Sequence, residues 1–168
     1  LYVVVAGVGV EIYDNENPEV ATYLSTIPAP SAVRAVPWGV HLFIAAGPSG
    51  LLVAEICDHG TPSIVGEVLG IDAADVTLYA HYQNGSAFDS RAYVADPSAG
   101  VHVIDLLPDF STPALVETLP LIGAAGLDTY SRYLVTDGIT PSQEHYYLYV
   151  AAGAAGLHVY DITVPDAI

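Results

Sequence analysis

Acidic side chains are the chemically reactive groups in which this 168-residue chain is richest. It has 19 aspartates and glutamates against three arginines and no lysine, and its formal net charge is −16. A nucleic-acid groove and a site for anionic membranes both need clustered basic residues, so this composition argues against either partner. The chemistry to look for is therefore that of carboxylates, which transfer protons and bind hard cations.

One pair of carboxylates is placed for catalysis. Asp75 and Asp128 lie in two predicted strands, 73–79 and roughly 127–135, that each lead into a repeated unit of the chain. Two facing carboxylates can hydrolyse a glycosidic bond, one as acid and one as nucleophile or base. The alternative is structural: the two carboxylates accept hydrogen bonds near the central channel around which the units would be arranged.

A short acidic loop offers a candidate calcium site. Its oxygen ligands are Asp14, Asn15, Glu16, Asn17 and Glu19. Ca²⁺ takes about six to eight oxygens, but the spacing here differs from that of an EF-hand loop. The alternative is a turn, because Asp and Asn side chains before proline bond their own backbone. Ca²⁺ is the one cofactor that the sequence suggests.

Four similar segments recur along the chain, at residues 1–14, 41–55, 91–105 and 147–161. Each reads as an apolar strand, a turn of small residues, a glycine, a second strand and an acid. We call the glycines the anchor glycines; they are Gly9, Gly50, Gly100 and Gly156. The acids follow five residues later and are Asp14, Glu55, Asp105 and Asp161. Self-similarity of this kind predicts one repeated supersecondary unit with loops of variable length.

Further short strands complete each unit. Those predicted after each acid are 20–24, 64–68 and 115–119, and those predicted to open the next unit are 31–36, 73–79 and 127–135. Short β-branched runs between Gly, Pro and Asp are typical of antiparallel all-β structure. The sequence thus predicts 14 strands, with three in the first and last units and four in each middle unit. The predicted units span 1–26, 27–70, 71–120 and 121–168.

The repeats resemble a known family. Residues 93–119 (YVADPSAGVHVIDLLPDFSTPALVETL) and 149–166 (YVAAGAAGLHVYDITVPD) are similar to the LVIVD-repeat β-propellers, which are mostly bacterial and archaeal secreted or cell-surface proteins. The resemblance implies four-stranded antiparallel blades and an extracellular or cell-surface location in a prokaryote. The chain would form an incomplete arc of about 3.5 blades. The second unit departs from the family pattern, since it ends in Ala54-Glu55.

In such an arc the insertions and acidic loops gather at one end of the blades. Their polar side chains form our predicted interaction face, composed of Asp58, His59, Asp89, Asp109, Asp137, Glu144 and His145. Functional residues are disproportionately found on loops that a rigid scaffold holds. The alternative is that these loops are simply polar and solvated.

The strand count also bears on function. Closed propellers have about 4 to 8 blades of four strands, more than the 14 strands expected here. We therefore expect a non-enzymatic extracellular interaction or structural module within a larger protein or assembly. Its partner would be another protein, or a further copy bound through open blade edges. The alternative is a hydrolase or metal-assisted enzyme that uses Asp75 and Asp128. We expect no membrane insertion, because the uncharged run 35–54 holds five prolines and glycines.

Overall fold

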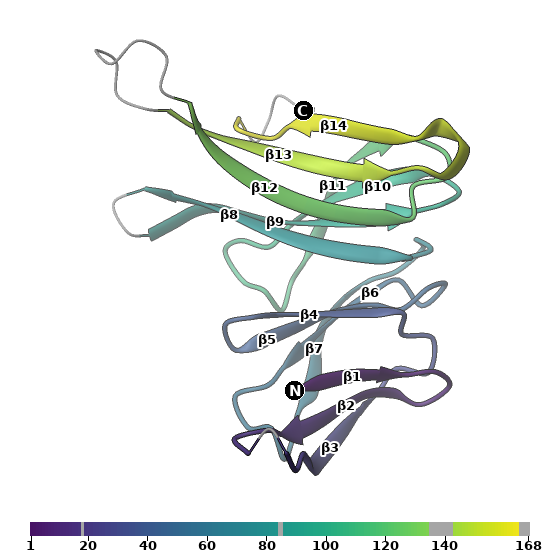
Figure 1. Ribbon diagram of the computed structural model, residues 1–168, viewed down its shortest axis with the longest axis vertical. Helices are drawn as coiled ribbons and strands as arrows, with labels where there is room; N and C mark the ends of the chain where they lie inside the picture. The colour runs from purple at the N-terminus through teal and green to yellow at the C-terminus, as the bar shows by residue number, and fades with distance from the viewer. Residues whose placement is uncertain (18, 84–85, 135–142, 165–168) are drawn as a thin grey trace.

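The chain folds into four antiparallel β-sheets, which confirms the all-β prediction (Figure 1). The computed structural model describes residues 1–17, 19–83, 86–134 and 143–164. The four sheets hold three, four, four and three strands in chain order, as the repeats predict. Within the described residues, no helix is both long enough and apolar enough to cross a membrane.

Each sheet is a meander of consecutive strands. Sheet 1 contains β1 (Tyr2–Val5), β2 (Gly9–Asp14) and β3 (Thr22–Pro28). Sheet 2 contains β4 (Arg34–Trp38), β5 (His41–Ala45), β6 (Leu51–Glu55) and β7 (Ser63–Val68). Sheet 3 contains β8 (Asp75–Gln83), β9 (Ser86–Asp96), β10 (Gly100–Asp105) and β11 (Ala114–Pro120). Sheet 4 contains β12 (Gly126–Leu134), β13 (Gln143–Ala151) and β14 (Leu157–Asp161), with the short 3-10 helix η1 (Gly153–Ala155) before β14.

The four repeated segments are the hairpins β1–β2, β5–β6, β9–β10 and β13–β14. Their anchor glycines all have positive φ, which L side chains rarely adopt. At Gly100 a second cause acts, because a Cβ there would lie 2.0 Å from the carbonyl oxygen of Leu119 in β11. The glycine therefore lets the outermost strand of the sheet approach closely.

The predicted boundaries of some strands were wrong by a few residues. The third strand was predicted at 20–24, but β3 runs from Thr22 to Pro28. The turn before it extends further than expected, because the Val20 amide donates to the Asn17 carbonyl oxygen. The strand then continues until Pro28 pairs with Gly9.

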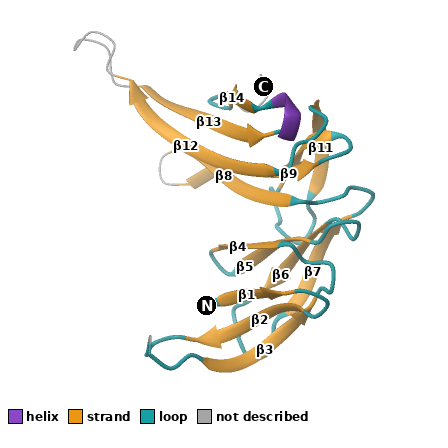
Figure 2. Cartoon of the chain, turned by 45° about the vertical axis from the view of Figure 1, so that its right-hand side comes forward, coloured by secondary structure: helices purple, strands orange, loops and turns teal. Residues whose placement is uncertain are grey.

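The sheets stack face to face in chain order, so that the two termini lie in opposite end sheets (Figures 1 and 2). An apolar cluster fills each junction between consecutive sheets. Val10 and Ile12 of sheet 1 meet Leu42 and Ile44 of sheet 2, for example. The first strands of consecutive sheets are also neighbours in space, since β4 contacts β1 and β8, and β8 contacts β12. Sheets 2 and 3 thus each offer one side to the sheet before and the other to the sheet after.

Candidate functional site

Among the described residues sheet 4 ends the stack, and only its side toward sheet 3 is covered. Leu148 and Val150 of β13 point toward sheet 3 and are fully buried. Because side chains alternate along a strand and directly paired residues share a side, the register defines the other side. We call this side the open face; it includes Gly126, Asp128, Tyr130, Arg132, His145, Tyr147, Tyr149, Ala151, Leu157, Val159 and Asp161.

The repeat supplies an internal reference for the open face. Leu157 directly follows its anchor glycine, as Val10, Leu51 and Val101 follow theirs. The three counterparts are 0% exposed, whereas Leu157 is 67% exposed. Two residues later Val159 is 52% exposed, although its counterparts Ile12, Val53 and Val103 are buried. Positions that form a sheet–sheet junction three times along the chain are therefore left in solvent the fourth time.

At the opposite end of the stack, no described sheet covers the outer side of sheet 1. Val3 in β1 pairs with Glu11, and Ile44 in β5 pairs with Leu52 at the same repeat position. Ile44 is fully buried against sheet 1, whereas Val3 is exposed. The two ends of the stack thus present the two sides that meet at every internal junction.

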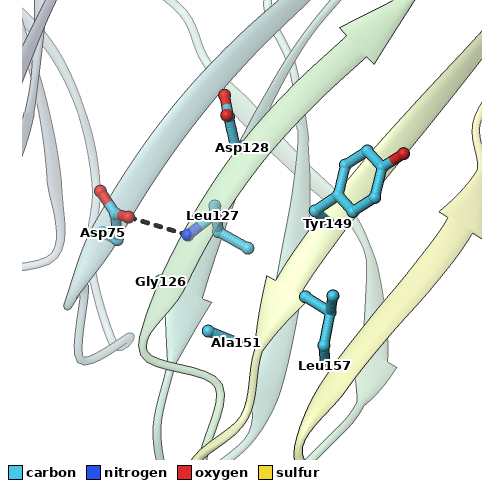
Figure 3. A pocket seen from close by; sticks show the side chains of 7 residues that line it. All are labelled: Asp75, Gly126, Leu127, Asp128, Tyr149, Ala151 and Leu157. Carbon is cyan, nitrogen blue, oxygen red and sulfur yellow. Dashed lines mark hydrogen bonds between the residues drawn. The ribbon is translucent and has the colours of Figure 1, made fainter.

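A shallow hollow of about 290 Å³ lies along the open face, near β12 (Figure 3). Apolar groups dominate its lining, and Asp75 and Asp128 are its two carboxylates. The lining residues are Asp75, Gly126, Leu127, Asp128, Tyr149, Ala151 and Leu157. The hollow is part of the surface that a further sheet would cover.

Asp75 and Asp128 line this hollow but have different surroundings. Asp75 is 9% exposed, and its two oxygens accept the amides of Val76 and Leu127, each at 2.8 Å. Arg34 in β4 adds an ion pair, with its Nε 3.5 Å from Asp75 Oδ1. One carboxylate thereby connects β4, β8 and β12. Within the described part of the chain, the exposed Asp128 accepts one local bond, from the Thr129 amide at 2.9 Å. This arrangement favours the structural alternative for Asp75.

Asp58 and His59, in the loop after β6, lie where the sequence placed them, at a loop end of the sheets. Asp58 accepts the Gly60 amide at 2.8 Å and the Thr61 hydroxyl at 2.9 Å. Both bonds lower the pKa of its carboxyl. His59 reaches back to sheet 1. Its Nε2 lies 3.0 Å from the Tyr2 hydroxyl, and its carbonyl accepts the Ser25 hydroxyl. The loop thus clamps sheet 2 to sheet 1.

The loop after β10 makes the same kind of clamp one sheet later. Asp109 accepts the Ser111 hydroxyl and amide, which lower the pKa of its carboxyl. The neighbouring Phe110 stacks on His41 of sheet 2 with ring centroids 5.0 Å apart. Asp89, in β9, accepts a bond from Arg91 Nε at 3.1 Å. Asp58 and Asp109 thus serve their own turns, and their loops contact the neighbouring sheet. The prediction of a loop position for Asp89 was wrong, because β9 begins at Ser86 and includes it.

The remaining predicted face residues belong to the last hairpin. Glu144 and His145 are half-buried in β13, and Asp137 lies outside the described residues. His145 Nδ1 is 3.7 Å from Asp161 Oδ2, and its ring stacks on Tyr147. Bonds from the Thr163 hydroxyl and amide lower the pKa of the Asp161 carboxyl. His145 therefore stands at one end of the open face rather than in a separate loop surface.

The candidate calcium loop forms turns. Asp14 Oδ1 accepts the Glu16 amide at 2.9 Å, and Asn17 Oδ1 accepts the Glu19 amide at 3.1 Å. These are the side chain to backbone bonds expected of Asx turns. Across the part of the chain that the structure describes, no group of three or more His, Cys, Asp or Glu is arranged to hold a metal ion. Calcium binding by Asp14, Asn15 and their neighbours stays a prediction.

Comparison with known proteins leaves the family open. No family model, no curated protein and no solved structure matches this chain. The resemblance of the repeats to LVIVD-repeat propellers therefore stays a prediction, and the function has to be argued from the geometry.

The open face was not singled out from the sequence, although open blade edges were expected of an incomplete arc. Leu157 and Val159 look like ordinary core positions, because their counterparts in the repeats are core. The signal that could have identified them is their place in the last of the four repeated units.

Proposed function

We propose that the chain is an arc of a β-propeller and acts as a non-enzymatic interaction or structural module in a larger protein or assembly. The open face of sheet 4 is its docking surface. The observation that carries this proposal is the exposure of Leu157 and Val159 at repeat positions that are buried in sheets 1 to 3.

Energetics support docking at this face. Burying a leucine or valine side chain contributes about 1.5–3 kcal/mol. The aromatic rings of Tyr130 and Tyr149 add area, and their hydroxyls can stay at the solvated rim. Asp128 and Asp161 stand at the border of the apolar centre, as polar residues do in protein interfaces. The partner that best fits such a face is another β-sheet.

The chemistry of Asp75 supports a non-enzymatic role. Its carboxylate is engaged by backbone amides of β8 and β12 and by Arg34. A catalytic carboxylate needs an oxygen directed at substrate, whereas this one holds three strands together. The proposed extracellular or cell-surface location rests on the LVIVD resemblance alone.

Sedimentation of the chain tests the docking surface. In about 1 M salt, where repulsion between copies of charge −16 is screened, the bare face should drive concentration-dependent association. The double variant Leu157→Glu, Val159→Glu should sediment as a monomer. The matched control is Ile122→Glu, which changes a side chain 69% exposed outside the open face and should associate as the parent does. A parent that stays monomeric, or a control that behaves like the double variant, would contradict the proposal.

A further inference from the structure

Two tyrosines from neighbouring sheets are in direct contact inside the junction between sheets 3 and 4. Tyr79 lies in β8 and Tyr146 in β13, and both pack against the apolar cluster of that junction. Their ring centroids are 4.4 Å apart, and the angle between the ring planes is 47°. Aromatic pairs usually have centroids about 4.5–7 Å apart, so these two rings are in close van der Waals contact. The contact joins two sheets through the same type of side chain.

The hydroxyl groups of the two rings are aligned as well. Burial raises the pKa of the Tyr79 hydroxyl, and a hydrogen bond to Tyr146 and the charge of Glu144 raise it further. Tyr79 is therefore a neutral phenol at ordinary pH. Because the hydroxyls are hydrogen-bonded and the rings are in contact, the ring carbons next to each C–OH carbon also lie close together. These ortho carbons are the atoms that couple when two tyrosyl radicals combine.

The composition of these residues makes tyrosine the main side chain that an oxidant can attack. The chain has 12 tyrosines, one tryptophan and one cysteine, and no methionine. Cys57 is exposed and is the single cysteine, so no disulfide can join two of the four sheets. A covalent bond between these sheets therefore has to come from other side chains, and tyrosine is the most abundant candidate.

We propose that Tyr79 and Tyr146 are an oxidative cross-linking site, at which a carbon–carbon bond between the two rings joins sheet 3 to sheet 4. The oxidant is hydrogen peroxide acting through a peroxidase, which removes one electron and one proton from each phenol. The two tyrosyl radicals couple at their ortho carbons, and the hydrogens on those carbons move to the oxygens and restore both phenols. The chain loses two hydrogen atoms, and one hydrogen peroxide becomes two water molecules. The site is independent of the proposed docking surface, because Tyr146 lies on the side of sheet 4 opposite the open face.

The cross-link would stabilise the fold as a disulfide does. It closes a long loop that contains most of sheet 3 and the first strand of sheet 4. Closing a loop restricts the unfolded chain, and in the chain-entropy model the stabilisation grows with loop length. The earlier junctions are clamped without a covalent bond, by His59 on Tyr2 and by Phe110 on His41. The junction between sheets 3 and 4 would thus become the most resistant to unfolding.

A second tyrosine pair provides the matched comparison. Tyr13 and Tyr23 lie in sheet 1, with ring centroids 5.8 Å apart and ring planes at 77°. Tyr23 is 54% exposed, and the Tyr13 hydroxyl donates to Glu11 rather than to Tyr23. An oxidant that only attacks accessible tyrosines would therefore link this pair first. Coupling that depends on ring contact and hydroxyl alignment instead selects Tyr79 and Tyr146.

Treatment of the dilute chain with a haem peroxidase and hydrogen peroxide tests the site. The expected product is a monomer two hydrogen atoms lighter, with dityrosine fluorescence, in which peptide mass spectrometry finds Tyr79 joined to Tyr146. This product should melt about 5 °C or more above the untreated chain. Tyr79→Phe and Tyr146→Phe keep the ring and remove the phenol, so each should abolish both the product and the gain in melting temperature. The matched control Tyr13→Phe should form the product as the parent does.

Each other outcome overturns the proposal. A link mapped to Tyr13 and Tyr23, or links only between separate chains, would show that exposure rather than ring contact decides the coupling. A lighter monomer that forms equally in Tyr79→Phe would place the bond elsewhere. A mapped link between Tyr79 and Tyr146 that leaves the melting temperature unchanged would remove its role in holding the two sheets together.

Discussion

His102 Nε2 lies 3.2 Å from Asp96 Oδ2 in the interior of sheet 3, where both side chains are buried. The same Asp96 oxygen accepts the Asp72 amide at 2.9 Å. The other oxygen accepts the Ser98 amide and hydroxyl, at 2.8 and 2.6 Å. Through His102 the network continues to Thr118 in β11. One carboxylate therefore connects the β9–β10 turn, the segment before β8 and, through an imidazole, the outermost strand.

Asp96 should make the chain sensitive to acid. Burial alone would raise the pKa of its carboxyl, but bonds from Ser98, Asp72 and His102 lower the pKa well below its usual value. Because the folded pKa is the lower one, this stabilisation is complete above the unfolded pKa of about 3.9 and is lost as the pH falls from there toward the folded pKa. The free energy of unfolding, measured in urea, should therefore fall between about pH 5 and pH 2.

The variant Asp96→Asn isolates this contribution. It places an amide NH₂ against donors, so it should lose about 1–3 kcal/mol at pH 7. Its deficit relative to the parent should shrink toward pH 2, because protonation of Asp96 in the unfolded parent removes most of the stabilisation that the carboxylate gives. Parallel pH profiles for the two proteins would show that another group causes the acid sensitivity.

Asp75 and Asp128 should differ in their effect on stability. Asp75→Ala removes the acceptor of the buried Leu127 amide, which should lower the free energy of unfolding by about 1–3 kcal/mol. Arg34 adds little, since its side chain is 55% exposed. The matched control is Asp128→Ala in β12, the first strand of sheet 4. This variant should change the free energy of unfolding by no more than about 0.5 kcal/mol. Equal losses in denaturant unfolding would contradict the role assigned to Asp75.

Leu51 and Leu157 permit a comparison of one residue type at one repeat position. Leu51→Ala should destabilise the chain by about 2–5 kcal/mol, because it leaves a cavity in the junction between sheets 2 and 3. Leu157→Ala should have almost no effect on the monomer, since the side chain is largely in solvent already. Chemical denaturation of both variants measures the difference. A comparable cost at Leu157 would mean that the open face is covered within the monomer.

The four hairpins could be predicted from the sequence because their signals are local. Each hairpin is encoded by two β-branched runs and an anchor glycine, such as Gly100, that lie within about 15 residues of one another. The place of Asp75 in the first strand of its sheet also followed from the repeat. The bond from the Leu127 amide did not, since it spans 52 residues and depends on how two sheets stack. The open face could not be predicted for a related reason. Leu51 and Leu157 are the same residue type at the same repeat position, and their exposure differs because a described sheet covers Leu51 and none covers Leu157.

Gly100 and Gly156 should report directly on the outermost strand. Gly100→Ala combines backbone strain of about 1–2 kcal/mol with a methyl group 2.0 Å from the Leu119 oxygen, so β11 must move away. Forced contacts of this kind cost about 1–3 kcal/mol more. Gly156→Ala should cost only the backbone strain, because its Cβ position is open. Thermal unfolding should thus place Gly100→Ala well below Gly156→Ala. If the two melt together, a strand already lies against Gly156.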